Sequence, residues 1–342
     1  MENNQYLYSL PLISLIVPCF NEEKYISRCL DSIIANNYPK DKIEILVIDG
    51  FSRDKTREII KDYINKYSFI KLLDNPKIIQ PTALNIGIKS AQGDIIIRLD
   101  AHSYIAPDFI LKSLEYLSKI DAVCVGGPIE TVGKGFIGKV IALVLSSAFG
   151  VGGSKFRTSK KAGYVDTIAF GAYRKEIFSK IGFFDENLTR SEDNDFNYRV
   201  RKAGGKIFMT PDIKVYYQAP GTLKKLLKQA FNNGWWNVKT LFLEKKACLS
   251  WRHFIPFFFT TGILLSAILI IWIPFLKSIL IFILILYVIL ACLGSILVIK
   301  QKRGELYYIP LLPLLFFIYH FIYGLGSLMF LLKLAFKRKK EI

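Results

Sequence analysis

The stretch IIIRLDAHSY, residues 95–104, starts as an apolar run and ends in polar side chains. Its isoleucines predict a strand inside a sheet, and side chains two positions apart on a strand share a face, so Arg98 and Asp100 point the same way. His102 follows in the next turn. A carboxylate and an imidazole placed in this way suit Mn²⁺ or Mg²⁺ when phosphate and water oxygens complete the shell. On this stretch alone, a simple turn-capping role for His102 is equally compatible.

Other apolar runs around this stretch also predict strands, at 12–18, 43–49, 69–73 and 122–127. They are rich in Ile, Val and Leu without alternation, which is typical of buried parallel strands. Between them, Ile26, Leu30 and Ile33 form one helical stripe, and Ile60 and Ile64 belong to a second. The pattern predicts an α/β fold with a doubly wound, mostly parallel sheet, in which ligands bind beyond the carboxyl ends of the strands.

Polar groups follow several of these strands. The segments PCFNEE (18–23), DGFSRDKT (49–56) and DAHSY (100–104) bring acids to one expected edge of the sheet. A second acidic cluster, in 184–207, contains Asp185, Glu186, Glu192, Asp193 and Asp195. Acids at the start of a helix also fit an ordinary helix dipole, so this cluster by itself leaves both interpretations open.

Taken in order along the chain, these motifs resemble the inverting family 2 glycosyltransferases of the GT-A fold, and most of all the succinoglycan-biosynthesis type. The resemblance covers about 12–240 and rests on VIDGFSRDKT (47–56), LDAH (99–102), FGAYRKEIF (170–178), GFFDENL (182–188) and SEDNDFNYRVRKAG (191–204). LDAH stands where the family usually has Asp-x-Asp, and the succinoglycan type commonly has this histidine.

The resemblance implies a nucleotide-sugar donor, with UDP as the expected nucleotide. Phe20, Glu22 and Asp49 would hold the uracil and the ribose, and Asp100 would bridge the diphosphate through a metal that His102 also binds. The implied cofactor is therefore a divalent metal, Mn²⁺ or Mg²⁺.

The same resemblance makes Asp193 the catalytic base, with Glu192 beside it. Attack at the anomeric carbon requires a carboxylate that takes the proton of the acceptor hydroxyl, and a cation that neutralises the leaving diphosphate. Arg98 is predicted to assist that neutralisation. We expect the like charge of Glu192 to raise the pKa of Asp193.

The last hundred residues are strongly apolar. The segments 254–276 and 278–299 are each close to the length of about 20 residues that spans a bilayer, and both predict transmembrane helices. The segment 306–332 is interrupted by prolines and glycines, and it is compatible with a full span, a kinked helix or a re-entrant segment.

A net charge of +18 suits either nucleic acid or an anionic membrane surface. The segment 223–246 places lysines between apolar residues at helical spacing and includes Trp235 and Trp236. It predicts a helix in the headgroup layer, where the tryptophans face the interface or the acceptor, although packing on the globular domain would give the same pattern.

The N-terminus has no secretory signal pattern, and the scattered cysteines suit a reducing compartment. We therefore expect a multi-pass protein of the cell membrane with a cytoplasmic catalytic domain. The basic loop at 300–305 agrees with this topology. A third full span would place the basic residues 337–340 on the other side, against the same rule.

The predicted division is a GT-A domain at 1–220, with a nucleotide-sugar half at 12–126 and an acceptor half at 127–220. An interfacial helix region follows at 221–253, then membrane segments at 254–332 and a basic tail at 333–342.

The region QAFNNGWW (229–236) lacks the arginine of the Gln-x-x-Arg-Trp motif found in processive synthases. The sequence thus favours transfer of one sugar to a lipid-linked saccharide in exopolysaccharide or cell-surface glycan synthesis, without nucleic acid as a partner. The alternatives are a polyprenyl-phosphate sugar synthase and, less well supported, a basic membrane scaffold without activity.

Overall fold

The computed structural model describes residues 10–242 and 248–338. The chain divides into two compact units. The first contains Met1–Glu130 and Lys160–Tyr217, and the second contains Thr131–Ser159 and Gln218–Ile342. Residues 131–159, which the sequence assigns to the predicted acceptor half, therefore group with the C-terminal helices.

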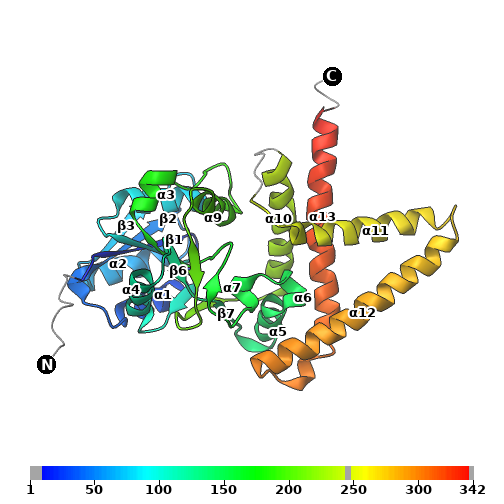
Figure 1. Cartoon of the computed structure of the whole chain (residues 1–342), viewed down its shortest axis with the longest axis horizontal. Coiled ribbons are helices and arrows are strands. Elements are labelled where there is room, and N and C mark those ends of the chain that lie inside the picture. The colour runs from blue at the N-terminus through cyan, green and yellow to red at the C-terminus, as the bar shows by residue number, and fades with distance from the viewer. Residues whose placement is uncertain (1–9, 243–247, 339–342) are drawn as a thin grey trace. The chain divides into compact units, whose positions relative to one another are not determined.

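An eight-stranded sheet forms the core of the first unit (Figure 1). Its strand order is β3-β2-β1-β4-β9-β6-β10-β8. The strands are β1 (Ile13–Cys19), β2 (Ile43–Asp49), β3 (Ile70–Asp74), β4 (Ile95–Arg98), β6 (Cys124–Gly126), β8 (Gly163–Tyr164), β9 (Gly171–Arg174) and β10 (Ile207–Met209). The predicted mostly parallel sheet is confirmed, because β3, β2, β1 and β4 are parallel neighbours.

Strand β9 is a finding that the apolar runs did not indicate. It lies between β4 and β6 and pairs antiparallel with both, so these two predicted strands are not neighbours. Burial follows position in the sheet: every residue of β1 and β2 is buried, whereas β3 at the edge is only partly covered.

Helices of the first unit pack on this sheet. They are α1 (Ile26–Ile34), α2 (Thr56–Lys66), α3 (Gln80–Ser90), α4 (Phe109–Lys119), α8 (Glu176–Ile181) and α9 (Glu192–Lys202). The predicted stripe on α1 is buried through Ile26, Leu30 and Ile33. On α3, a Cβ added at Gly87 would lie 2.5 Å from Cγ2 of Ile16, so only glycine permits this close approach to β1.

A three-stranded sheet of order β5-β11-β7 continues from the LDAH segment (99–102). Its strands are β5 (Ser103–Ile105), β11 (Val215–Gln218) and β7 (Ile129–Val132). Because β5 begins directly after His102 and pairs Ser103 with Tyr217, the backbone on the far side of the motif is also held in a sheet.

The second unit is helical. It contains α5 (Gly135–Ser146), α6 (Ala148–Val151), α7 (Lys155–Thr158), α10 (Leu223–Phe242), α11 (Ile255–Leu269), α12 (Phe275–Lys302) and α13 (Leu312–Arg338). Within the described residues, three helices are long and apolar enough to cross a membrane: Trp251–Leu269, Phe275–Lys302 and Leu312–Phe336. The break between the first two falls before Phe275, so Lys277 lies inside α12 and does not separate the spans as predicted.

The predicted amphipathic helix is α10, and its small residues pack on α13, beside which it runs in Figure 1. A Cβ at Gly234 would lie 1.9 Å from the carbonyl oxygen of Tyr323. The hydroxyl of Ser327 donates to the carbonyl of Gly234 at 3.1 Å, and the Asn237 amide donates to the hydroxyl of Tyr323. One face of α10 is therefore committed to another helix of its own unit.

Candidate active site

The predicted site residues of the first half collect at one edge of the large sheet. Strands β1, β2 and β4 are parallel, so their carboxyl ends, followed by Phe20, Glu22 and Asp100, lie at the same edge. Asp49 is the last residue of β2 and is level with Cys19 of β1. The strand-end arrangement expected from the sequence is thus present in the structure.

The loops after β1 and β2 are joined by their own backbone groups. The amide of Asn21 donates to the Ser52 hydroxyl at 2.8 Å, and the amide of Arg53 donates back to Oδ1 of Asn21 at 2.8 Å. One residue on, the amide of Glu22 donates to the Thr56 hydroxyl at 2.7 Å. These reciprocal bonds fix the position of Glu22 relative to β2.

Asp49 is fully buried and anchors the loop that follows it. Its Oδ2 accepts from the amide of Ser52 at 3.0 Å and from Arg57 at 2.8 Å. Arg57 also binds Asp74 at the end of β3, at 2.7 Å. The structure therefore encloses the Asp49 carboxylate beneath the loop, and Arg57 ties the ends of β2 and β3 together.

Three large apolar side chains stand exposed beside this loop. Phe20, Phe51 and Ile78 are 43%, 47% and 46% exposed. A Cβ at Gly50 would lie 3.2 Å from Cγ2 of Ile78 and 3.4 Å from Cδ2 of Phe20, so these two flank the Gly50 backbone. Phe51, Ile78 and the neighbouring Asn21 have positive φ, at 56°, 58° and 55°. Such conformations are costly for residues with side chains and gather at functional sites.

The two proposed metal ligands are each held on one side by another residue. Nδ1 of His102 lies 2.9 Å from Oε1 of Glu22, and the amide of Gln80 donates to Oδ1 of Asp100 at 2.9 Å. This leaves Nε2 of His102 and Oδ2 of Asp100 without a protein hydrogen bond in the described ranges. A partner on the second nitrogen is the usual arrangement for a metal-binding histidine.

This donor set fits a divalent ion that shares its shell with substrate. Within residues 10–242 and 248–338, no group of three or more His, Cys, Asp and Glu side chains is placed to hold a metal by itself. One carboxylate and one imidazole would therefore need phosphate and water oxygens to complete six ligands, as Mg²⁺ and Mn²⁺ sites on nucleotides do.

The surroundings of His102 favour its positive charge. Burial lowers the pKa of its imidazole, but the hydrogen bond and charge of Glu22, with the charge of Asp100, outweigh burial and raise it. The ring also packs edge-on against Tyr217, with centroids 5.2 Å apart. A bound cation has to compete with this proton.

Arg98 joins Asp100 of the LDAH segment (99–102) to the second acidic cluster. Its Nη2 lies 3.0 Å from Oε1 of Glu192, and its Nε lies 3.6 Å from Oδ1 of Asp100. Both Arg98 and Glu192 are buried. Burial raises the pKa of Glu192, an effect that Arg98 opposes and that Asp193 adds to.

The acids at the start of α9 have different surroundings. Glu192 binds Arg98, and Asp195 is fully buried with Oδ2 2.9 Å from Nε of Arg199. Asp193 is half-buried, and no arginine or lysine binds it within the described ranges. Asp193 is thus the acid of this turn that is most available to a substrate hydroxyl.

The loop before α9 is fastened to α3. Asn85 donates to the carbonyl of Phe184 at 2.9 Å and to Oε1 of Glu186 at 3.0 Å, while Nζ of Lys77 lies 2.7 Å from Oε2 of Glu186. Lys77 and Asn85, against the effect of burial, lower the pKa of Glu186 to about 2. Asp185 instead caps its own turn by accepting from the amide of Asn187.

Trp235 and Trp236 lie on α10 in the second unit. Trp235 packs edge-on against Phe330 of α13, with centroids 5.1 Å apart, and Lys239 lies 4.0 Å from the centre of the Trp236 ring. Their predicted role at the acceptor or the interface stays a prediction.

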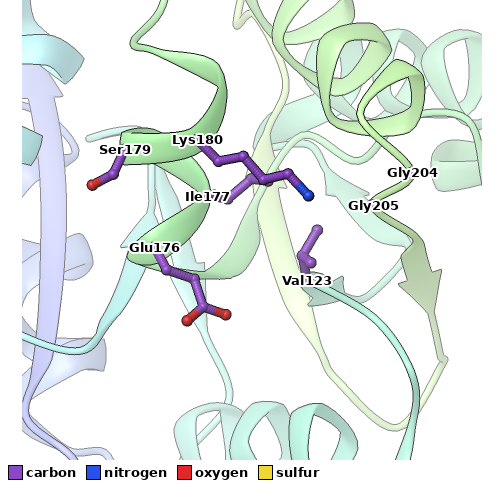
Figure 2. A pocket seen from close by; sticks show the side chains of 7 residues that line it. All are labelled: Val123, Glu176, Ile177, Ser179, Lys180, Gly204 and Gly205. Atoms are coloured by element: carbon purple, nitrogen blue, oxygen red, sulfur yellow. The ribbon is translucent and has the colours of Figure 1, made fainter.

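One cavity of about 580 Å³ lies elsewhere on the first unit (Figure 2). It is lined by Val123, Glu176, Ile177, Ser179, Lys180, Gly204 and Gly205. Val123 directly precedes β6, which runs parallel to β4 because both pair antiparallel with β9. The cavity is therefore at the amino end of β6, at the opposite edge of the sheet from Asp100.

Several residues of the site were missed from the sequence, including the exposed Phe51 and Ile78. Gln80, Arg57 and Asn85 bind Asp100, Asp49 and Glu186, and each is a common polar residue without a motif of its own. Gln80 carried the best signal, because the Gln-Pro step at 80–81 marks a helix start, in the segment that follows β3.

Comparison with known proteins gives a consistent result. The glycosyl transferase family 2 model matches residues 14–182. The chain is 32% identical over 329 residues to the dolichyl N-acetyl-alpha-D-glucosaminyl phosphate 3-beta-D-2,3-diacetamido-2,3-dideoxy-beta-D-glucuronosyltransferase of Methanococcus voltae, covering 94% of this chain and 97% of the relative. It is 31% identical over 244 residues to succinoglycan biosynthesis protein ExoA of Rhizobium meliloti, covering 71% and 73%.

A solved structure with the same architecture is the mannosyltransferase PcManGT from Pyrobaculum calidifontis, in complex with GDP-Man and Mn²⁺. The TM-score is 0.60 over 93% of this chain and 87% of that one, at 18% identity. This likeness concerns the fold alone, and it confirms the GT-A fold predicted from the motifs.

Proposed function

Since the chain belongs to glycosyl transferase family 2 and is a glycosyltransferase, we propose that it transfers one sugar, with inversion, from a nucleotide-sugar to a lipid-linked saccharide. The observation that carries this proposal is the bridge from Asp100 through Arg98 to Glu192. It brings the motif assigned to the donor and the motif assigned to the acceptor into one site.

The donor is proposed to lie over the ends of β1, β2 and β3. The exposed faces of Phe20, Phe51 and Ile78 suit a nucleobase, which is flat and apolar on both sides. Asp49 acts from beneath, because it holds the loop that carries Phe51. Glu22 follows Phe20 and orients His102, so donor and metal contacts come from one short segment.

Asp100 and His102 are proposed to hold Mn²⁺ or Mg²⁺ on the diphosphate. When bound, the ion supplies Lewis-acid neutralisation of the leaving group. The protein residues keep the two ligands oriented through Glu22 and Gln80, so that the shell requires little rearrangement on binding.

Asp193 is proposed to take the proton from the acceptor hydroxyl as that oxygen attacks the anomeric carbon. The new bond forms on the face opposite the diphosphate, whose bond to the sugar breaks, so the configuration inverts. General base catalysis of this kind is worth about 10²–10⁴-fold in rate. Glu192 is turned toward Arg98 and does not share this role.

The acceptor is proposed to be a saccharide on a polyprenyl phosphate or diphosphate, presented at a membrane surface. The Methanococcus relative is named for a glycosylated dolichyl phosphate acceptor, and the part of this chain that the structure describes has three helices apolar enough to span a bilayer. We propose the cell membrane as its location, with the first unit in the cytoplasm and without nucleic acid as a partner.

The proposal is tested with membranes that contain the protein and two acceptors, a polyprenyl phosphate and the same lipid carrying N-acetylglucosamine. Labelled UDP-glucose, UDP-galactose, UDP-N-acetylglucosamine, GDP-mannose and a nucleotide-activated diacetamido-dideoxyglucuronic acid serve as donors. Label in the organic extract is counted with Mn²⁺, with Mg²⁺ and with chelator, for the wild type and for Asp193→Asn.

We expect metal-dependent label only on the glycosylated lipid, lost in Asp193→Asn. Label on the bare polyprenyl phosphate that survives Asp193→Asn would instead establish a polyprenyl-phosphate sugar synthase, because a phosphate acceptor needs no general base. Absence of label from every donor and acceptor would reject the transferase proposal for these substrates.

A further inference from the structure

Arg98 occupies an unusual position for a residue expected at a diphosphate. It is 7% exposed, and it reaches Asp100, two residues away, and Glu192, 94 residues away in sequence. Its guanidinium carbon lies 6.0 Å from the ring centre of Phe184, which stacks on Phe196 of α9 with centroids 4.5 Å apart. The charge is thus enclosed between the end of β4 and the first turn of α9.

This arrangement contributes little to the stability of the fold. A buried ion pair costs desolvation that is recovered only when its hydrogen bonds are complete. Nε of Arg98 has no hydrogen-bond partner among the described residues, and its distance of 3.6 Å to Asp100 is too long for one. Apolar side chains of similar volume would fill the same space at no greater cost.

The same arrangement does, however, fix the relative positions of the groups that it joins. The planar guanidinium has fixed donor directions, so it sets the distance between the two carboxylates it contacts. One carboxylate is that of Asp100, which follows the end of β4. The other, Glu192, immediately precedes Asp193 at the start of α9. The residue before this helix, Ser191, has a left-handed φ of 67°.

We infer that Arg98 and Glu192 are a positioning pair, which holds the proposed base Asp193 in register with the metal-binding end of β4. The inference rests on the proposed function. Neither member of the pair touches the reacting atoms. Arg98 acts by fixing Glu192, and Glu192 acts by fixing the turn on which Asp193 lies, so the pair sets how the base approaches a hydroxyl whose electrophile is bound at Asp100.

The test compares Arg98→Lys, Glu192→Gln and the double variant Arg98→Met/Glu192→Leu with the wild type, using the purified full chain. Arg174→Lys is the matched control, because Arg174 ends β9 of the same sheet and donates to the carbonyl of Leu117, away from the acids. For each protein kcat, KM for donor and for acceptor, and the melting temperature are measured.

We expect kcat to fall about 10- to 100-fold in all three variants, because a displacement of roughly 1 Å at a reacting group has this effect. KM for the donor should change less than about threefold, because the contacts that bind the donor equally in the ground state and the transition state are unchanged. The double variant should melt at or above the wild-type temperature, which separates loss of positioning from loss of fold. Arg174→Lys should keep its kcat.

Two results would overturn the inference while leaving the transferase intact. If the double variant keeps wild-type kcat, the pair is dispensable. If Arg98→Lys raises the donor KM at unchanged kcat, Arg98 contacts the diphosphate. Absence of transfer by the wild type would instead reject the proposed function, and the positioning role with it.

Discussion

Glu22 and His102 lie in the loops after β1 and β4, 80 residues apart in sequence, with Oε1 and Nδ1 2.9 Å apart. The contact fixes the ring so that Nδ1 faces the carboxylate and Nε2 faces away. In metal sites such a partner typically accounts for a 10- to 100-fold effect on metal affinity. Glu22 therefore orients His102, in addition to the donor contact predicted from the sequence.

We predict that Glu22→Gln weakens Mn²⁺ binding about 10- to 100-fold, because the amide holds the imidazole less strongly. Binding is measured by titration of Mn²⁺ into the protein with UDP present, and by the Mn²⁺ concentration that gives half-maximal rate. Glu23→Gln is the control, since the Glu23 carboxylate accepts from the amide of Lys55, at 3.1 Å, in an exposed contact. Equal metal affinity in both variants would contradict the orienting role.

Replacement of the proposed base should separate chemistry from binding. We predict that Asp193→Asn lowers kcat about 10²- to 10⁴-fold and leaves donor affinity unchanged within about threefold. Asp121→Asn is the control: its side chain is 86% exposed, pairs with Lys206 and precedes β6 at the other edge of the sheet. A full rate in Asp193→Asn would assign the base elsewhere.

Glu186 gives the first unit a component of acid sensitivity. Its pKa is lowered from 4.5 to about 2 by Lys77 and Asn85, so the folded state prefers the ionised form more than the unfolded state does. That stabilisation is complete above the unfolded pKa and is lost as the pH falls from about 4.5 to about 2.

We therefore predict that Glu186→Gln lowers stability at neutral pH by ~1 kcal/mol, since the pair is partly exposed. The difference from the wild type should shrink at about pH 3, as the wild-type carboxyl becomes protonated. The four tryptophans all lie in the second unit, so unfolding is followed instead by circular dichroism at both pH values, with exposed Glu58→Gln as the control. A difference independent of pH would exclude the ion pair as its source.

The contact between α10 and α13 requires glycine. We predict that Gly234→Ala destabilises the second unit by about 2 kcal/mol or more, because its Cβ would lie 1.9 Å from the Tyr323 carbonyl oxygen. Gly262→Ala is the matched control, as nothing lies within 4 Å of a Cβ there and alanine favours a helix. Melting temperatures of the detergent-solubilised variants measure the difference. A neutral Gly234→Ala would show that the two helices separate easily.

Much of the first unit followed from the sequence because its apolar runs are long. The segments 12–18 and 43–49 became β1 and β2 within a residue, since burial on both faces leaves no other use for such runs. Strand β9 was missed because Gly171–Arg174 has one apolar side chain larger than alanine, Tyr173, and no pattern. It forms only because β4 and β6 offer it two edges.

In the candidate site, the sequence placed residues at the correct edge but did not show which charges bind each other. Arg57 is eight residues after Asp49 and encloses it, a contact that depends on the turn between them. In the second unit, the segment 306–332 is interrupted at Pro310, which lies between the short 3₁₀ helix Leu306–Tyr308 and α13, whereas α13 continues through Gly324 and Gly326. Pro313 falls in the first turn of α13, where proline is tolerated.

The positive φ angles at Asn21, Phe51 and Ile78 also affect attempts to raise the thermal stability of this protein. Each has a left-handed backbone conformation, which costs about 1–2 kcal/mol for a residue with a side chain. Glycine would adopt the same conformation without that steric cost. A screen for heat resistance alone would therefore tend to collect glycine at these positions. Glycine at Phe51 or Ile78 would remove part of the exposed apolar surface proposed to hold the nucleobase. Selection for thermal stability and selection for catalytic activity should therefore favour different residues at these two positions.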